Sequence, residues 1–342
     1  MNESNVIVRA EGLVKEYPIR SSSLLPSRRK AVHAASDVSF SLYKGETLGL
    51  VGESGCGKST VGRMLVGIEA PTAGKVFYQG QDLSLLKGRE LARVRTQLQM
   101  VFQDPYSSLN PRKRVYDILS EPMLYHGIVS RDGAAARVDE LLDMVGLPKN
   151  AKQRYPHEFS GGQRQRITIA RALSLRPSVI VCDEPVSALD MSIQAQILNL
   201  LRSLQKDLGI TYLFIAHGLG AVHYVSDRTA VMYLGRIVEI GSAADVFHHP
   251  EHPYSKMLLS AVPSTDPMKR GQEILTPQGE VPSAIDLPSG CRFHDRCPYA
   301  KDICRNQEPL LNADDSAPHL CACWKVLAEQ EGRNWDQDGE VH

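Results

Sequence analysis

A glycine-rich segment at residues 49–60 constrains this chain more than any other stretch. Residues 52–59 fit the pattern of a glycine, four free positions and then Gly-Lys-Ser, directly after an apolar run at 47–51. Such a loop points its backbone N–H groups and the next helix N-terminus at one anion. We therefore predict a phosphate loop that binds a nucleoside triphosphate, with Lys58 on the phosphates and Ser59 on Mg²⁺. A turn without a ligand is the alternative, which the Lys and two following hydroxyl residues disfavour.

Bulk properties exclude several classes of function. Lys plus Arg and Asp plus Glu both number 39 among 342 residues, so no global charge indicates nucleic acid or an anionic membrane. The first residues lack the basic and apolar regions of a signal peptide, and no apolar run approaches the ~20 residues that span a bilayer. We expect a cytoplasmic protein that reaches a membrane only through partners.

Strand and helix patterns alternate along most of the chain, which predicts an α/β fold with a mainly parallel, mixed sheet covered on both faces. Helical spacing between 115 and 146 interrupts this pattern and predicts an inserted helical subdomain at about 104–166. The expected strands are 5–17, 38–42, 47–51, 75–78, 98–102, 179–182 and 212–216. The expected helices are 59–66, 88–95, 167–175, 192–208, 243–248 and one ending at 261.

Proline and glycine become frequent after residue 241, which indicates a second region. We place the boundary near Pro263, between a nucleotide-binding domain at 1–262 and a small cysteine-rich extension at 263–342. The basic stretch 20–30 is expected to be an exposed loop, and the polar tail from Ala328 is expected to be frayed.

Two acidic residues and a histidine follow predicted strands. Asp183 and Glu184 end one strand, and His217 ends another, so all three should lie at the carboxyl edge of the sheet, where open α/β folds bind ligands. There, Asp183 can hold Mg²⁺ through water and Glu184 can polarise an attacking water. A solvated turn for the acidic pair and a structural role for the histidine are the alternatives.

The phosphate loop, Gln103, the Ser-Gly-Gly-Gln segment at 160–163, the Asp-Glu pair and His217 occur in an order that resembles the ATP-binding cassette (ABC) ATPases over about 6–241. The resemblance implies ATP hydrolysis, with Glu184, His217 and Gln103 as catalytic residues. Gln103 would reach both Mg²⁺ and the water, and Tyr17 would stack on adenine. The implied ATP and Mg²⁺ site consists of Tyr17, Gly52, Glu53, Ser54, Gly55, Cys56, Gly57, Lys58, Ser59, Thr60, Gln103 and Asp183.

The signature at 160–163 offers a second anion site at a helix N-terminus. The family resemblance implies a head-to-tail dimer in which this site caps the ATP of the other subunit, with residues 187–190 crossing the interface. This implied group consists of Ser160, Gly161, Gly162, Gln163 and Asp190. Two departures stand out: Phe159 replaces the usual leucine, and Gly218 follows His217 where an aspartate is usual. Neither removes a catalytic group.

A closer resemblance is to the ATPases of dipeptide and oligopeptide importers. It rests on residues 103–112, on the His-Pro-Tyr at 252–254 and on the cysteine segment 290–323. It implies two transmembrane permeases, a sister ATPase in a heterodimer, a periplasmic or extracellular substrate-binding protein, and a peripheral place on the cytoplasmic face of the inner membrane. The cargo stays open among dipeptides, longer peptides, nickel chelates, glutathione and oligosaccharides. Soluble cassette ATPases of ribosomes or DNA are disfavoured, since they usually carry two cassettes or a long coiled coil.

The seven cysteines are unevenly placed. Cys56 and Cys182 are isolated, and we expect them to be half-buried small thiols. The other five fall between 291 and 323, where a reducing compartment favours a metal or cluster site over disulfides. Their spacing lacks the two-residue knuckle typical of zinc, and Cys297 precedes a proline, as iron–sulfur cysteines often do.

The importer resemblance implies a [4Fe–4S] cluster at this segment. Its ligands would be Cys291, Cys297, Cys304 and Cys323, with Cys321 as the alternative fourth ligand. Zinc and reduced structural thiols remain the alternative interpretations. A cluster this far from the ATP site would act as a clamp on the fold or as a redox sensor.

Overall fold

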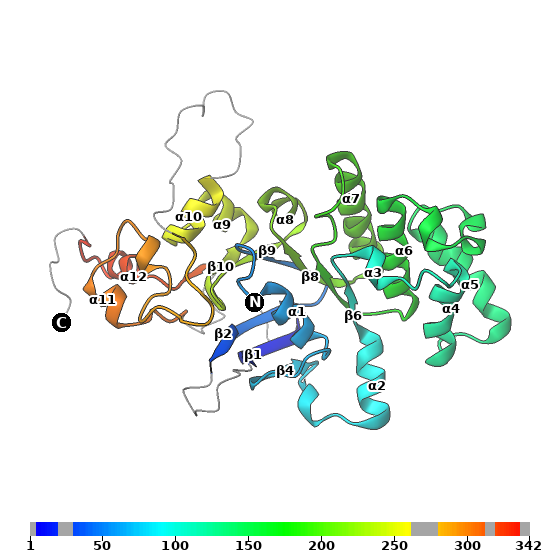
Figure 1. The fold of residues 1–342 in the computed structure, drawn as a ribbon, viewed down its shortest axis with the longest axis horizontal. Coiled ribbons are helices and arrows are strands. Elements are labelled where there is room, and N and C mark those ends of the chain that lie inside the picture. Colours follow the sequence, from blue (N-terminus) through cyan, green and yellow to red (C-terminus); the bar gives the residue numbers. More distant parts are fainter. Residues whose placement is uncertain (1–4, 20–29, 261–279, 312–318, 336–342) are drawn as a thin grey trace.

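The computed structural model describes residues 5–19, 30–260, 280–311 and 319–335. It is elongated, with a helical subdomain at one end, the cysteine-rich extension at the other and the α/β core between them (Figure 1). Among the described residues, no helix is both long and apolar enough to cross a membrane.

A seven-stranded sheet forms the centre, in the order β11-β10-β9-β3-β8-β7-β6. The five neighbouring strands from β9 through β3 and β8 to β7 and β6 are parallel. Strand β10 pairs antiparallel with β9, and β11 pairs antiparallel with β10, so the predicted mixed sheet is confirmed. Every residue of β3, β7 and β8 is buried, as expected for parallel strands covered on both faces. The bounds are β3 Thr47–Val51, β6 Leu98–Val101, β7 Val179–Asp183, β8 Thr211–Ala216, β9 Arg228–Tyr233, β10 Arg236–Ser242 and β11 His319–Cys321.

A smaller antiparallel sheet has the order β2-β1-β4-β5. Helix α1 (Lys58–Leu65) contacts strands of both sheets, and its buried face joins their common core through Val61 and Leu65. The strand bounds are β1 Val6–Pro18, β2 Ala31–Tyr43, β4 Ala73–Tyr78 and β5 Gln81–Asp82. The remaining core helices are α2 Gly88–Gln97, α7 Met191–Leu208, α8 Leu219–Val225, α9 Ala243–His248 and α10 Pro253–Ser260, and a short 3₁₀ turn, η2, spans Leu83–Leu85.

The helical subdomain follows β6. Its helices pack through apolar side chains such as Leu119, Val138 and Leu142, which are fully buried. Helix α6 begins at Gly161 rather than at the predicted 167, because Ser160 and Gln163 form a capping box that starts the helix earlier. The bounds are α3 Pro105–Ser108, α4 Val115–Tyr125, α5 Arg131–Met144, η3 Lys149–Gln153, η4 Pro156–Glu158 and α6 Gly161–Ser174.

Two predicted segments lie outside the described residues: the basic stretch, apart from Lys30, and the boundary near Pro263. The domain limits at 262 and at about 104–166 therefore stay predictions. The prediction of a frayed tail from Ala328 was wrong as far as Trp335, because the Trp335 side chain is buried and only 4% exposed. Its indole Nε1 donates a hydrogen bond to the Tyr299 carbonyl at 3.2 Å, and Lys301 lies over its ring.

The cysteine-rich extension contains η6 His294–Arg296, α11 Asp302–Asn306, β11 and α12 Trp324–Gln330. It joins the core where β11 pairs with β10 and where Glu239 of β10 is fully buried. The Glu239 carboxylate accepts hydrogen bonds from the N–H groups of Glu251 and His252, at 2.8 and 3.0 Å, and contacts His319 Nε2 at 2.8 Å. Burial alone would raise the pKa of Glu239, but these hydrogen bonds lower it, so the carboxylate stays ionised.

His252 should make stability depend on pH. Its ring is 1% exposed, its Nδ1 accepts the Tyr254 N–H at 3.0 Å, and burial lowers its pKa to about 4. The unfolded chain, with a pKa of about 6.5, binds the proton first, so this contribution is present above pH 6.5 and is lost as pH falls towards 4. Between pH 7 and 4.5, wild type should lose about 2 kcal/mol more unfolding free energy than His252→Gln.

Urea unfolding followed by circular dichroism measures this difference. The exposed His249, replaced by Gln, is the matched control and should keep the wild-type pH dependence. Parallel pH profiles for wild type and His252→Gln would contradict the prediction.

Candidate nucleotide-binding site

The loop between β3 and α1 has a backbone that only glycine permits at two positions. Gly52 and Gly57 have φ of 155° and 106°, and a Cβ on them would lie 2.1 and 1.8 Å from backbone oxygens of Met232 and Ala34. Lys58 is 4% exposed, and its Nζ donates hydrogen bonds to the carbonyls of Gly52 and Glu53 at 2.8 and 2.9 Å. The Lys58 ammonium and the N-terminus of α1 thus lie on the same loop, where both can bind an anion.

Ser59 and Asp183 form the predicted magnesium pair. The Ser59 Oγ donates a hydrogen bond to Asp183 Oδ1 at 2.8 Å, which joins the loop to the end of β7. Burial raises the pKa of Asp183, opposed by the Ser59 hydrogen bond and by the nearby Arg63 and Lys58 charges. Oxygen ligands of this kind, together with phosphate oxygens, suit Mg²⁺.

The next residue, Glu184, is held between the two other predicted catalytic residues. Gln103 Nε2 donates a hydrogen bond to Glu184 Oε2 at 2.7 Å, and His217 Nε2 contacts Glu184 Oε1. Glu184 is 5% exposed and adopts a φ of 49°, with its N–H bonded to the Ile215 carbonyl at 2.9 Å. Glu184 immediately follows β7 at the carboxyl end of the strand, and its carboxylate is a group that can accept a proton from water.

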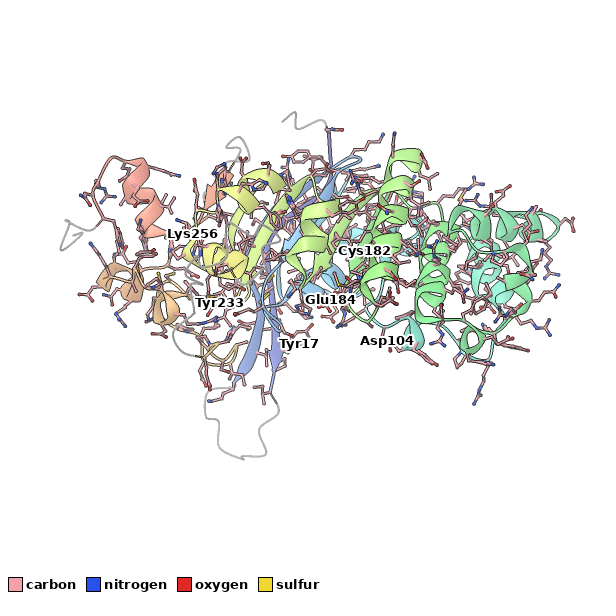
Figure 2. All side chains as sticks on the ribbon, turned by 90° about the horizontal axis from the view of Figure 1, so that it is seen from above. Tyr17, Asp104, Cys182, Glu184, Tyr233 and Lys256 are labelled. Carbon is pink, nitrogen blue, oxygen red and sulfur yellow. The ribbon has the colours of Figure 1, made fainter. Side chains whose placement is uncertain are left out.

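Tyr17 lies beside this site at the end of β1. Its hydroxyl pairs with Glu69 and contacts Thr60 of α1, and Lys15 Nζ lies 5.1 Å from its ring centroid. Figure 2 labels Tyr17 and Glu184. Tyr17 thus lies next to α1, and its stacking on adenine stays a prediction.

The signature residues form a second group at the N-termini of α6 and α7. Ser160 and Gln163 bond to each other's backbone N–H groups, and Asp190 caps α7 by accepting the Ile193 N–H at 3.0 Å. A Cβ on Gly162 would lie 2.4 Å from Ile193 Cγ2, so glycine is needed for this helix contact. Ser160, Gly161 and Gln163 are exposed at this helix N-terminus, which is the kind of position where anions bind.

Two contacts to the phosphate loop were missed by sequence reasoning. The Glu53 N–H donates a hydrogen bond to Tyr254 Oη at 2.8 Å, and the Glu53 carboxylate accepts two hydrogen bonds from Arg296 at 2.8 and 3.0 Å. Arg296 lies 243 residues further along the chain, and no local pattern points to this pairing.

The structure brings the four predicted cysteines to one small cavity, lined by Cys291, Cys297, Cys304 and Cys323. Cys321 is placed elsewhere, in β11 opposite Glu239. Burial raises the pKa of Cys291 to about 12 and that of Cys297 to about 11. Within the described residues, however, no group of three or more Cys, His, Asp or Glu side chains converges as a single metal ion would need.

Comparison with known proteins agrees with this geometry. The ABC transporter family matches residues 35–187, and the oligopeptide/dipeptide transporter C-terminal region matches 238–304. A dimeric ATP-binding cassette, MJ0796 bound to ADP and Pi, superposes with a TM-score of 0.61 at 26% identity, over 69% of this chain and 99% of that one. The fold and the site are those of an ABC-type ATPase that uses ATP and Mg²⁺.

Individual relatives are much closer in sequence. The oligopeptide transport ATP-binding protein AppF of Bacillus subtilis (strain 168) is 50% identical over 93% of this chain and 96% of its own length. The oligopeptide transport ATP-binding protein OppF of Salmonella typhimurium is 51% identical over 87% of this chain and 89% of its own length. The chain belongs to this family of ABC transporter ATP-binding proteins.

Replacing the carboxylate of Glu184 tests the catalytic assignment. Glu184→Gln keeps the shape and the contacts to Gln103 but cannot take a proton, so turnover should fall about 10²- to 10⁴-fold while ATP still binds. Phosphate release and ATP binding measured on the same preparation check this. Lys58→Ala should instead lose ATP binding, and near-normal turnover of Glu184→Gln would contradict the assignment.

Proposed function

We propose that this chain energises the uptake of peptides through separate transmembrane permeases, attached peripherally at the cytoplasmic face of the membrane. The observation that carries the proposal is 50% identity over 93% of the chain to an oligopeptide transport ATP-binding protein, in a chain that keeps Lys58, Asp183, Glu184 and His217 together. A nickel chelate, glutathione or an oligosaccharide is the alternative cargo.

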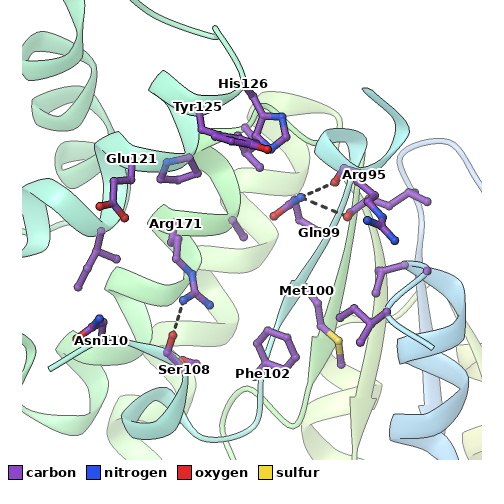
Figure 3. Close-up of a pocket in the computed structure, with 18 of the residues that line it drawn as sticks. Arg95, Gln99, Met100, Phe102, Ser108, Asn110, Glu121, Tyr125, His126 and Arg171 are labelled. Carbon is purple, nitrogen blue, oxygen red and sulfur yellow. Dashed lines mark hydrogen bonds between the residues drawn. The ribbon is translucent and has the colours of Figure 1, made fainter. Parts of the chain in front are cut away.

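A groove of about 950 Å³ supports a permease partner. It lies between the end of α1 and β6 on one side and α4 and α6 on the other (Figure 3). Tyr125 and Ile68 at this groove are 86% and 54% exposed, whereas Arg171 ties its floor by donating a hydrogen bond to the Ser108 carbonyl. An apolar helix of a permease with polar ends would fit such a lining.

The groove and the hydrolytic site share one segment. Gln103, which bonds Glu184, lies two residues after the end of β6, and Ser108 and Asn110 further along line the groove. If water or phosphate replaces the contact between Gln103 and Glu184, Gln103 would move. The segment that carries Ser108 and Asn110 would then move with it and change the shape of the groove. This short connection supports coupling between hydrolysis and a membrane partner.

In the proposed cycle, ATP occupies the phosphate loop and a second ATPase chain, a sister subunit, covers it with its own signature. Glu184 polarises a water that attacks the γ-phosphate, and Lys58 stabilises the charge that develops on the leaving ADP. Mg²⁺, which Ser59 and Asp183 would hold, would supply further neutralisation of phosphate charge. His217 and Gln103 hold Glu184 in place through their contacts with its two oxygens. Hydrolysis then reopens the dimer and resets the permeases.

The cysteine cavity is proposed to hold a [4Fe–4S] cluster. A cluster binds each thiolate to a separate iron, whereas zinc needs all four sulfurs about 2.3 Å from one point. The four soft thiols that line this one cavity support the proposal, since thiolates are the ligands of iron–sulfur clusters, and zinc remains the alternative. The cluster would supply cross-links between η6, α11 and the start of α12, and its thiols would have to lose their protons on binding.

Peptide dependence tests the proposed transport function. The chain reconstituted in vesicles with its two permeases and a sister ATPase should hydrolyse ATP several-fold faster when a peptide-loaded binding protein is added. Phosphate release measures the rate, and the same complex carrying Glu184→Gln is the control. Unchanged hydrolysis with peptide, but stimulation by a nickel chelate, glutathione or an oligosaccharide, would favour the alternative cargo.

A matched pair of cysteine variants tests the cluster. Cys297→Ser removes a thiol that lines the cavity, and should abolish bound iron and acid-labile sulfide in protein purified without oxygen. Cys321→Ser removes a thiol outside it and should keep both. Equal iron content in the two variants, or zinc in wild type, would contradict the cluster.

A further inference from the structure

The cysteine-rich extension reaches the phosphate loop through one buried arginine. Arg296 of η6 has a side chain that is 4% exposed, and both of its terminal nitrogens donate to the Glu53 carboxylate, at 2.8 and 3.0 Å. Two-point pairing of a guanidinium with a carboxylate fixes orientation as well as charge. Glu53 is the first free position of the loop, immediately after Gly52.

An aromatic cluster of Tyr233, Tyr254 and Phe293 holds this arginine in place. The ring centroids of these residues lie 4.6 to 5.5 Å apart, and the guanidinium lies 5.7 and 5.8 Å from the rings of Tyr233 and Phe293. Arg296 also donates a hydrogen bond to Tyr233 Oη at 3.3 Å. The cluster combines β9, α10 and the extension, and the arginine itself contacts its members from β9 and from the extension.

All three polar groups of Glu53 are engaged. Its N–H donates to Tyr254 Oη, its carbonyl accepts from Lys58 Nζ, and its carboxylate is taken by Arg296. When phosphates draw Lys58 away from the carbonyl, Tyr254 and Arg296 remain to hold the loop. An unpaired carboxylate at this position would also repel the phosphates that the loop must bind.

We propose that Arg296 is a positioning residue for nucleotide binding: it neutralises and orients Glu53, and through it the cysteine-rich extension sets the affinity of the phosphate loop for ATP. The inference rests on ATP binding by this loop and is independent of the cargo. Its effect is expected on the binding of ATP rather than on the chemical step, since Arg296 touches neither Glu184 nor His217.

A double-mutant cycle on the full chain tests the proposal. Arg296→Ala should raise the Kd for Mg·ATP, measured by calorimetry, about 5- to 10-fold. In the Glu53→Gln background, where no carboxylate needs neutralising, the same change should alter Kd by less than about twofold. In the assembled transporter, the variant should raise KM by a similar factor while kcat at saturating ATP stays within about twofold of wild type.

Arg292→Ala is the matched control. Arg292 is an arginine of the same extension with a side chain that is 10% exposed, but it pairs with Glu308 at 3.4 Å and with the Leu234 carbonyl instead of the loop. Its loss should lower the melting temperature without raising the Kd for ATP. If Arg296→Ala does not fold, Arg296→Lys replaces it in both backgrounds, with an expected rise of about threefold in the wild-type background alone.

Equal effects of the arginine change in the two Glu53 backgrounds would overturn the proposal. So would an equal rise in Kd for Arg292→Ala, since loss of extension docking would then explain the result. The Kd measurements, unlike those of KM and kcat, need no permease and no peptide. They would therefore remain interpretable if the proposed transport function were wrong. Equal effects of Arg296→Ala in the two Glu53 backgrounds would, in turn, not contradict the transport function.

Discussion

The in-register parallel pairing of β3, β8 and β7 is the constraint on which the rest of this structure depends. Val51 pairs with Ala216 and Asp183 with Ile215, so the three strands end at the same level. The loops that follow them therefore deliver the lysine, the two carboxylates and the histidine to one edge. A slip of one residue in any pairing would turn every side chain of the shifted strand to the opposite face and separate these groups.

Much of the core could be predicted from sequence because its strands are continuous apolar runs between clear turn signals. The predicted bounds of β3 match the observed ones, and those of β7 and β8 differ by one residue at one end. Strands β9 and β10 were not predicted, since they are stabilised by pairing with β3 and with each other around a turn at Gly235. Tertiary pairing of that kind leaves little periodicity to recognise. The early start of α6, by contrast, carried a readable capping signal.

The catalytic groups were predictable where a motif is local, and unpredictable where the contact joins distant segments. The phosphate loop and the Asp-Glu pair are short patterns with a direct chemical reason. The support of Glu53 by Arg296 and Tyr254 depends on how the extension folds back, which spacing cannot reveal. The choice between Cys321 and Cys323 was open for the same reason. The two cysteines differ only in how the chain runs from β11 into α12: Cys321 stays in the sheet, whereas Cys323 lies at the cavity.

The order in which the sheet is assembled has a consequence for synthesis. Its central strand β3 comes from residues 47–51, whereas its edge strand β11 comes from residues 319–321. Until residues 319–321 have been synthesised, one edge of β10 presents unpaired N–H and C=O groups to its surroundings. A nascent chain that already contains the phosphate loop thus exposes an unpaired strand edge, which can form hydrogen bonds with a strand of another polypeptide. A chain whose translation stops before β11 should therefore be prone to aggregation.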